Sequence, residues 1–510
     1  MPSSESTPLI SLSCDSVPKT RAGICKFDAI TIGIGPAGMS IAGMGAKMGL
    51  NVLAIEKTNR TGGECMSFGC IPSKAILKKA SIWRTVKKYL PEDMTIGDEG
   101  RYEDLVGPLQ ADLSEIAEKK MNKMVSGETL HKLFKHEARF KDSKTVAVRP
   151  VGTKPGCSEE RLVTAKNIFI CTGSSPFIPP CAGLREIKHG RLLTNNNIFT
   201  IEVPKTITVV GGGFIACELS EAYACLGSKV TIVQRSSRLV RTLPEEVSEM
   251  VEEALTKFGC EVIHCDPMDK FTQDPETHNV SLHLGSGRVI ESEYVLVAAG
   301  RTPNVKSLNL EAAGVKQDAK GYITVDRLLR TSVKTIWACG DVNGHDLLSH
   351  AAMMQGQVAL MNCVFPVGMR KNFKDCVVPA TMFTTPQVSY VGAKRHELEK
   401  SGEKFEILRT TYEGYGATYA QGIREGFLEV YATPFKGKIL GALMVGEASG
   451  ELINEWTVAM QNGVTCYDIM MTMHSFPTIG WQSGRIAQIW MEKLLEKHPK
   501  VKGMMSWMYS

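Results

Sequence analysis

Two glycine loops, each placed between a β-branched apolar run and a helical pattern, constrain the fold of this chain more than any other feature. The first loop covers residues 33–38 and the second covers residues 211–216. After each helical pattern comes another short apolar run, at 51–55 and at 229–233. Two βαβ units of this kind predict an α/β protein with two doubly wound, Rossmann-type nucleotide-binding domains.

The first loop has the spacing of a dinucleotide-binding turn, with Gly33, Gly35 and Gly38. Glycines there let the backbone approach a pyrophosphate, which then lies at the N-terminus of a helix. Glu56 ends the following apolar run, where a carboxylate can accept hydrogen bonds from ribose hydroxyls. We interpret this unit as a dinucleotide site, and the alternative is a plain glycine turn.

The second loop, with Gly211 and Gly213, is the variant that ends in alanine. The acidic residue expected at the end of its second strand is replaced by Gln234. Three arginines follow: Arg235, Arg238 and Arg241. A carboxylate would repel a 2′-phosphate, whereas guanidinium groups can form paired hydrogen bonds with it. The pattern predicts NADPH in preference to NADH. The alternative, a solvated arginine face, leaves the missing acid unexplained.

Cys65 and Cys70 form a C-x4-C pair behind a glycine-rich segment that includes Gly63. Pro72 predicts that a helix begins close to Cys70, since proline is tolerated in the first turn. A helix N-terminus favours a thiolate, so this pair is a candidate redox dithiol. The spacing is neither a four-cysteine zinc pattern nor a C-x-x-C motif. Two buried structural cysteines are the alternative.

Composition limits the remaining classes of function. The chain has 510 residues, 43% hydrophobic and 22% charged, which is typical of a folded protein with several domains. A net charge of +5 without a basic block argues against a nucleic-acid binder. No apolar run is long enough to span a membrane. The 15 scattered cysteines indicate a reducing compartment, and we expect a cytoplasmic protein.

The chain resembles the pyridine nucleotide–disulfide oxidoreductases, the group of glutathione reductase, lipoamide dehydrogenase and mercuric reductase. The resemblance runs from about residue 26 to 495. It depends on motifs in a fixed order: both glycine loops, the cysteine pair with Ile71-Pro-Ser-Lys74, and the turns Thr172-Gly173, Gly300-Arg301-Thr-Pro303 and Cys339-Gly340-Asp341.

The resemblance implies FAD and a nicotinamide dinucleotide as cofactors, together with a homodimer. Cys70 would lie against the flavin and Cys65 would exchange with a small-molecule acceptor, while Lys74 would pair with Glu218. Phe214 stands where the family often has a tyrosine over the nicotinamide pocket. The other residues that would contact a cofactor are Gly33, Gly35, Gly38, Glu56, Gly63, Thr172, Gly173, Gly340 and Asp341 for FAD, and Gly211, Gly213, Arg235, Arg241, Gly300 and Arg301 around the two nucleotides.

Domain limits follow from the same resemblance and from the change to antiparallel strand patterns near residue 376. We expect a flexible tail at 1–26, an FAD-binding domain in two parts at 27–180 and 298–375, and an NADP-binding domain at 181–297. A C-terminal α+β dimerisation domain would cover 376–510. Residues 82–130, with their mixed charges, are predicted to form a helical excursion from the first domain.

One departure from the family bears on the acceptor. Phe476 occupies the position of the family's acid–base histidine, and Trp481 that of the glutamate that orients it. Neither side chain carries a proton, and loss of general acid–base catalysis typically costs ~10²–10⁴-fold. His474 is either a displaced base or a structural histidine.

The leading interpretation is a reductase that passes electrons from NADPH through FAD to the Cys65–Cys70 pair and on to a small disulfide or a metal ion. We predict no resident metal site. Three alternatives stay open: a quinone-reducing diaphorase, a dihydrolipoamide dehydrogenase and a flavin redox sensor with low turnover.

Overall fold

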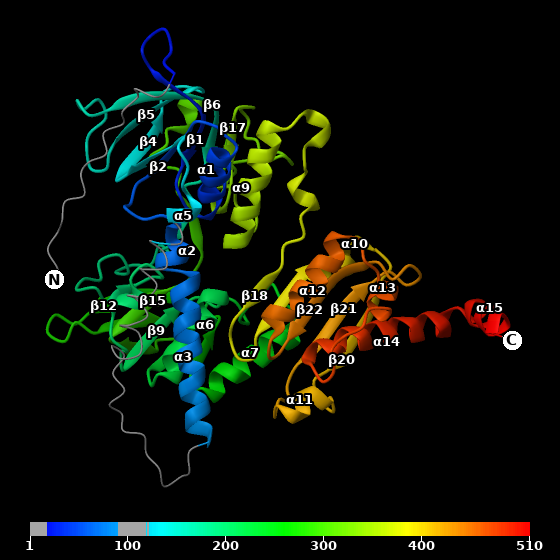
Figure 1. Ribbon diagram of the computed structural model, residues 1–510. Helices are drawn as coiled ribbons and strands as arrows, with labels where there is room; N and C mark the ends of the chain where they lie inside the picture. The colour runs from blue at the N-terminus through cyan, green and yellow to red at the C-terminus, as the bar shows by residue number, and fades with distance from the viewer. Residues whose placement is uncertain (1–17, 90–118, 120–121, 510) are drawn as a thin grey trace.

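In the computed structural model, which describes residues 18–89, 119 and 122–509, the chain is built around three main sheets (Figure 1). The first has seven strands in the order β3-β2-β1-β6-β5-β4, with β17 paired to β6. The strands of this sheet are β1 Cys25–Ile32, β2 Val52–Glu56, β3 Leu130–Phe134, β4 His136–Phe140, β5 Thr145–Pro150, β6 Arg161–Ile170 and β17 Ile336–Ala338.

Helices α1 (Pro36–Lys47) and α9 (Ser349–Val364) pack together beside the parallel part of the first sheet. Strands β1, β2, β3, β6 and β17 are parallel, and their buried faces are rich in β-branched and aliphatic residues. Because the carboxyl ends of parallel strands meet at one edge, the glycine loop after β1 and the segments after β6 and β17 lie close together.

The second sheet is also parallel, in the order β11-β10-β9-β15-β8. Between β11 and β15 the chain forms a small antiparallel sheet in the order β12-β13-β14. Its strands are β8 Leu192–Leu193, β9 Thr206–Val210, β10 Lys229–Gln234, β11 Glu261–His264 and β15 Tyr294–Val297. Its helices are α6 Phe214–Cys225 and α7 Glu245–Lys257, and the antiparallel strands are β12 Met268–Gln273, β13 Val280–Leu284 and β14 Val289–Ser292. Two doubly wound units are therefore present, as predicted.

The third sheet is antiparallel, in the order β18-β19-β22-β21-β20. Its strands are β18 Ala380–Met382, β19 Val388–Gly392, β20 Glu406–Thr411, β21 Phe427–Ala432 and β22 Ile439–Val445. Its helices are α10 Arg395–Ser401, α11 Gly416–Ala420, α12 Ser449–Gln461, α13 Cys466–Met470, α14 Gln482–Lys497 and α15 Pro499–Tyr509, the last of which extends from the body at the C-terminus. The predicted fold class, with an α+β unit after the two nucleotide units, is confirmed.

Helix α3 (Cys70–Tyr89) connects the first two units. It follows the short helix α2 (Gly63–Ser67) and packs against α6 of the second unit, as Figure 1 shows. The chain crosses from one unit to the other through β7 (Ser174–Pro176) and returns through β16 (Arg301–Pro303), and these two strands pair with each other. Cys65 on α2 and Cys70 on α3 thus lie at the start of the helix that packs against the second unit.

Two predictions about organisation change. Lys19 forms an antiparallel bridge with Cys25, closed by a turn in which the Thr20 amide donates to the Ile24 carbonyl and the Ile24 amide donates to the Thr20 hydroxyl. Residues 19–25 of the expected tail therefore form a hydrogen-bonded turn. The helical excursion predicted for 82–130 holds up to Tyr89, whereas β3 already begins at Leu130. Residues 1–17 and 90–118 lie outside the described part. The other domain limits stay predictions.

No helix in the described part of the chain is long and apolar enough to span a bilayer.

Candidate active site

The two cysteines of the C-x4-C pair face each other at the start of α3. Cys65 lies on α2, and Cys70 is the first residue of α3. Their sulfur atoms are 2.8 Å apart, both side chains are half-buried, and both are free thiols. The structure therefore shows the reduced dithiol, with the Cys65 thiol donating to the Cys70 sulfur.

The surroundings of Cys70 favour its thiolate. The hydrogen bond from Cys65 lowers the pKa of Cys70 to about 6, although burial acts in the opposite direction. The Ser349 hydroxyl, 3.2 Å from the Cys70 sulfur, and the charge of Lys74 also lower this pKa. Pairing with Cys70, together with burial, raises the pKa of Cys65. The pair thus shares one proton at neutral pH, with the charge on Cys70.

Lys74 lies one turn along α3 from Cys70 and forms the predicted ion pair. Its Nζ donates to Glu218 Oε2 at 2.6 Å, from α6 of the second unit. The same ammonium lies 4.8 Å from the ring centre of Phe383, which follows β18 in the third unit. Lys74 is therefore held by side chains from two other parts of the chain, and Glu218 is almost completely buried.

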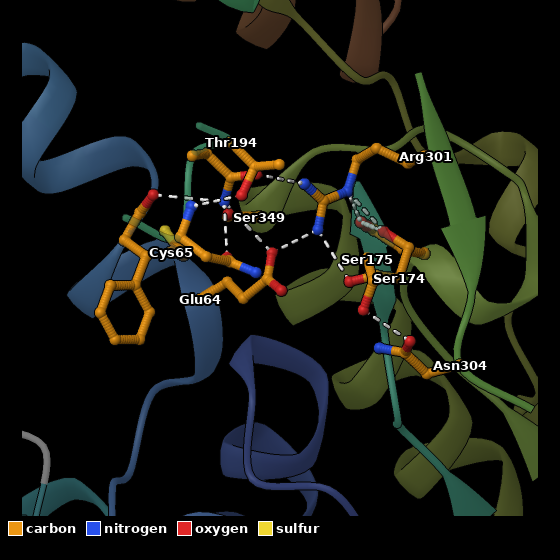
Figure 2. A network of polar contacts seen from close by, with 12 residues as sticks. Glu64, Cys65, Ser174, Ser175, Thr194, Arg301, Asn304 and Ser349 are labelled. Atoms are coloured by element: carbon orange, nitrogen blue, oxygen red, sulfur yellow. Dashed lines mark hydrogen bonds and ion pairs between the residues drawn. The ribbon is translucent and has the colours of Figure 1, made fainter. Parts of the chain in front are cut away.

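Arg301 connects α2, which carries Glu64 and Cys65, with the turn after β17. Figure 2 shows its guanidinium between Glu64, the neighbour of Cys65, and Ser174, the first residue of β7. Arg301 Nε donates to Ser174 Oγ at 2.6 Å and lies 3.5 Å from Asp341 Oδ2, which also accepts from Ser174 Oγ at 2.6 Å. Arg301 thus fixes two carboxylates, Glu64 and Asp341, and its role as a direct cofactor ligand stays a prediction.

The first glycine loop fits the pyrophosphate of a dinucleotide. A Cβ on Gly33 would lie 2.4 Å from the Cys171 carbonyl oxygen, and one on Gly38 would lie 2.0 Å from the Gly33 carbonyl oxygen. Gly35 is different, because a Cβ there would meet nothing within 4 Å. Close packing at two glycines and open space at the third, next to the N-terminus of α1, leave room for a phosphate group.

Other residues of the predicted FAD site lie along the same edge of the first sheet. Glu56 ends β2 and is buried, and its carboxylate accepts from the Ile34 amide at 2.9 Å, which places it beside the glycine loop. A Cβ on Gly63 would lie 2.9 Å from Gly35 Cα. Thr172 Oγ1 is buried without a hydrogen-bond partner, and Gly173 follows it. These residues, with Gly340 and Asp341 after β17, fit FAD.

The second glycine loop repeats this geometry in the second unit. A Cβ on Gly211 would lie 2.4 Å from the Ala298 carbonyl oxygen, while one on Gly213 would meet nothing within 4 Å. Arg235 and Arg241 are exposed beyond the end of β10. Arg238 is half-buried, and one of its terminal nitrogens, Nη1, is buried without a partner. Free guanidinium nitrogens beside an open loop fit a 2′-phosphate.

Phe214, the first residue of α6, and Glu218 lie four positions apart, so they share the face of α6 that meets α3. Phe214 is half-buried against the core of the second unit. The predicted nicotinamide gate and the predicted Lys74 partner are therefore neighbours on one helix. Gly300 precedes Arg301 in the crossing back to the first unit.

His474 lies on the third unit, away from the dithiol in sequence, and both its ring nitrogens have oxygen partners. Nε2 is 2.7 Å from Glu455 Oε1 of α12, and Nδ1 is 3.0 Å from the Thr472 carbonyl oxygen. Phe476 and Trp481 pack edge to face with ring centres 5.5 Å apart, and the Phe476 side chain is 70% exposed. Phe476 and Trp481, at the positions of the family's acid–base pair, thus form an aromatic contact at the surface.

Several residues of the site carry no motif that marks them. Ser349 contacts Cys70 from the first residue of α9, and Phe383 lies over Lys74. Glu64 could have been suspected, since it adjoins Cys65. Asn195, which donates to Glu64 at 3.4 Å, follows β8 and has no recognisable spacing to the cysteines.

This arrangement defines an oxidoreductase with two dinucleotide loops and a dithiol between them. The chain belongs to the pyridine nucleotide–disulphide oxidoreductase family: the family model matches residues 27–361, and the model of the family's dimerisation domain matches residues 378–483. Members are FAD-dependent enzymes that use a nicotinamide dinucleotide.

The curated relatives come from two groups of enzymes. The chain is 31% identical over 467 residues to the dihydrolipoyl dehydrogenase of Geobacillus stearothermophilus, which covers 89% of this chain and 94% of the relative. It is also 31% identical over 458 residues to the mercuric reductase of Lysinibacillus sphaericus, covering 89% and 81% respectively. Sequence identity therefore does not separate the two activities.

Solved structures show the same fold. The flavoprotein disulfide reductase RclA of Escherichia coli, solved as a Cu(II) complex, superimposes with a TM-score of 0.79 at 22% identity, covering 91% of this chain and all of RclA. LpdA of Mycobacterium tuberculosis superimposes with a TM-score of 0.79 at 21% identity, covering 90% of this chain and 99% of LpdA.

Proposed function

We propose that the chain is an NADPH-dependent flavoprotein reductase in which electrons pass through FAD to the Cys65–Cys70 pair and then to a small acceptor, either a thiophilic metal ion or a disulfide. One observation carries the proposal: two free thiols 2.8 Å apart, one with a pKa of about 6, lie beside the Lys74–Glu218 ion pair and between two dinucleotide loops. The dimerisation domain supports a homodimer, and the cytoplasm is the proposed compartment.

Bound FAD would supply the ability to take a hydride and to pass on two electrons. The glycine loop at Gly33–Gly38, Glu56 and Asp341 would hold it. Arg235 and Arg241 would bind the 2′-phosphate of NADPH, and Phe214 would cover the nicotinamide. Each of these residues occupies the position described above, at the carboxyl edge of its sheet.

The residues around the dithiol keep one sulfur ionised and the other protonated. Lys74 stabilises the charge on Cys70, and Glu218 neutralises the lysine, so the Lys74–Glu218 ion pair brings little net charge. Cys65 keeps the proton in the resting dithiol, and it would have to lose that proton to react with an acceptor. A thiolate is the nucleophile and the metal ligand of such a site.

The aromatic pair on the third unit favours a metal ion as the acceptor. Disulfide exchange needs a proton for the leaving thiolate, and neither Phe476 nor Trp481 can supply one. A soft metal ion bound by two thiolates needs no such proton, and sulfur ligands select soft metals. One curated relative is a mercuric reductase, and RclA was solved with Cu(II), which agrees with this class of acceptor.

Anaerobic titration of the purified protein with NADPH, followed by visible absorbance, tests the proposal. We expect a long-wavelength charge-transfer band near two-electron reduction that is lost in Cys70→Ser. The matched control is Cys376→Ser, which changes a half-buried thiol of the third unit. Bleaching of the flavin without that band would contradict the proposal. Retention of quinone reduction in Cys65→Ser would then favour the diaphorase.

A further inference from the structure

A pair of buried carboxylates on α6 joins all three units of the chain next to the dithiol. Glu218 and Glu221 lie three positions apart on α6, and each is only 4% exposed. Glu218 belongs to the Lys74 ion pair. Glu221 has no part in the proposed function, although burying a charged group is expensive unless it has partners.

The partners of Glu221 come from both other units. Its Oε1 lies 3.3 Å from Arg84 Nη1. Arg84 is on α3, about four turns after Cys70 on the same helix. Its Oε2 accepts from the backbone amide of Thr385 at 2.7 Å, in the loop between β18 and β19. One carboxylate thus contacts both α3 and the third unit. Glu221 and Thr385 are 164 residues apart in the sequence.

Glu218 binds the same loop two residues earlier. Its Oε1 accepts from the backbone amide of Phe383 at 2.9 Å, while its Oε2 accepts from Lys74. The Phe383 ring in turn lies 4.8 Å from Lys74 Nζ. The two carboxylates therefore fix the 383–385 backbone at two points, and that backbone carries the ring that contacts the active-site lysine.

We propose that Glu221 is a positioning residue of the redox site: by holding the Thr385 amide, it keeps Phe383 over Lys74 and so keeps the lysine charge beside the Cys70 thiolate. This inference deepens the proposed function and rests on it. Glu221 touches neither thiol; it acts through the 383–385 segment.

The charged and titratable groups around Glu221 agree with this role. Arg84 faces it from α3, and its guanidinium also lies 5.0 Å from the Phe258 ring centre beyond α7. Glu218 and the buried Cys217 interact with it from α6, and Cys260 from the turn after α7. Arg84 is the cation among these groups and lowers the pKa of Glu221, whereas burial raises it. The carboxyl oxygens therefore stay within the shared helix interface.

The test uses the full-length protein reduced with dithiothreitol. Iodoacetamide alkylation of Cys70 is followed by peptide mass spectrometry over a range of pH, and the midpoint reports the pKa of its thiol. In Glu221→Gln the amide cannot satisfy both Arg84 and the Thr385 N–H, so Lys74 is less well held. We expect the Cys70 midpoint to rise by about 0.5 to 1 pH unit, because a nearby cation favours the thiolate.

Three further variants make the result specific. Glu429→Gln is the matched control, since Glu429 is an equally buried carboxylate in the third sheet and pairs with Arg409 instead; its midpoint should equal the wild-type one. Glu221→Asp keeps a carboxyl group, so the Cys70 midpoint should rise less than in Glu221→Gln. Phe383→Leu should raise the midpoint without touching the carboxylate, and combining it with Glu221→Gln should add little.

The outcomes separate this inference from the proposed function. A wild-type Cys70 midpoint at the ordinary thiol value of about 8.5 would contradict the proposed function itself. A low wild-type midpoint that stays unchanged in Glu221→Gln, or in Phe383→Leu if the first variant does not fold, would overturn only the positioning role. An equal shift in Glu429→Gln would do so as well, because the effect would then be general.

Discussion

At the scale of single residues, we expect the choice between the two nicotinamide dinucleotides to depend on side chains beyond the end of β10. Arg235 and Arg241 are exposed, so replacing them should not disturb the fold. Hydrogen bonds to charged groups contribute about 1.5–3 kcal/mol, which corresponds to roughly 10–100-fold in binding.

We therefore expect Arg235→Ala and Arg241→Ala each to raise the KM for NADPH by roughly 10-fold or more, and to leave the KM for NADH within about 2-fold. Steady-state kinetics with both dinucleotides measure this. Arg424→Ala, an exposed arginine of the third unit, is the control. An equal loss with NADH would show that these arginines do not read the 2′-phosphate.

The aromatic pair permits a gain-of-function experiment. Phe476 and Trp481 lie at the surface of the third unit, so polar replacements there cost little packing. Phe476→His combined with Trp481→Glu would restore a proton-carrying pair. We expect turnover with small disulfides to rise by about 10-fold or more, since general acid–base catalysis typically contributes ~10²–10⁴-fold.

Phe476→Ala combined with Trp481→Ala is the matched control for that experiment, because it removes the rings without adding a base. If both double variants reduce disulfides at the same rate, proton transfer at this surface does not limit the reaction.

The individual side chains of the site were predictable to different degrees. Cys65, Cys70 and Lys74 stand close together in sequence on a recognisable motif, and their positions follow from local helix geometry. Ser349 lies 279 residues from Cys70, so their contact depends on how α9 packs and not on any spacing. Nothing in the sequence marks Glu221, because its partners Arg84 and Thr385 lie 137 and 164 residues away.

At the scale of elements, the glycine loops combine two different steric requirements. Gly33 and Gly38 are needed because neighbouring backbone is too close for a Cβ. Gly35 has extended backbone angles that any residue can adopt, and its missing side chain faces open space. Among the three glycines of the first loop, Gly35 is therefore the position where a substitution tests ligand binding without disturbing the fold.

We expect Gly35→Ala to fold normally and to lose most of its FAD, because the methyl group enters the space beside the N-terminus of α1. Flavin retained on purification and the midpoint of thermal unfolding measure the two effects. Gly416→Ala, where a Cβ also meets nothing, is the control and should keep its flavin. A fully flavinated Gly35→Ala protein would place the pyrophosphate elsewhere.

The elements themselves were the most predictable part of the structure. The strands and helices of both βαβ units follow from clear periodicity, and their limits agree within a few residues. The pairing of Lys19 with Cys25 falls within the predicted tail at 1–26, and no pattern in this polar segment indicates it.

At the scale of the whole molecule, the buried Glu221 makes stability depend on pH. Burial raises its pKa from 4.5 to about 7 in the folded chain, despite the Thr385 hydrogen bond and Arg84. Between these values the folded state binds more protons than the unfolded state, so this residue lowers stability as pH rises from about 4.5 to 7, and its effect is constant above. The shift corresponds to roughly 3 kcal/mol.

Glu221→Gln removes this titration. We expect its thermal midpoint to improve relative to wild type, by a few degrees, as pH rises from 5 to 7.5. Parallel melts of wild type, Glu221→Gln and Glu429→Gln measure the difference. If the difference in thermal midpoint between Glu221→Gln and wild type does not change with pH, the Glu221 carboxyl group has the same pKa in the folded and unfolded states.

The course of α6 has a consequence for building hybrid enzymes. Its first turn belongs to the nucleotide loop, while Glu218 and Glu221 further along serve the dithiol and the third sheet. Transplanting the whole nucleotide module from a relative would therefore import foreign anchors for the lysine and the 383–385 loop. We expect a graft confined to the segment from the end of β10 to Arg241 to change the coenzyme preference and to leave the native anchors in place.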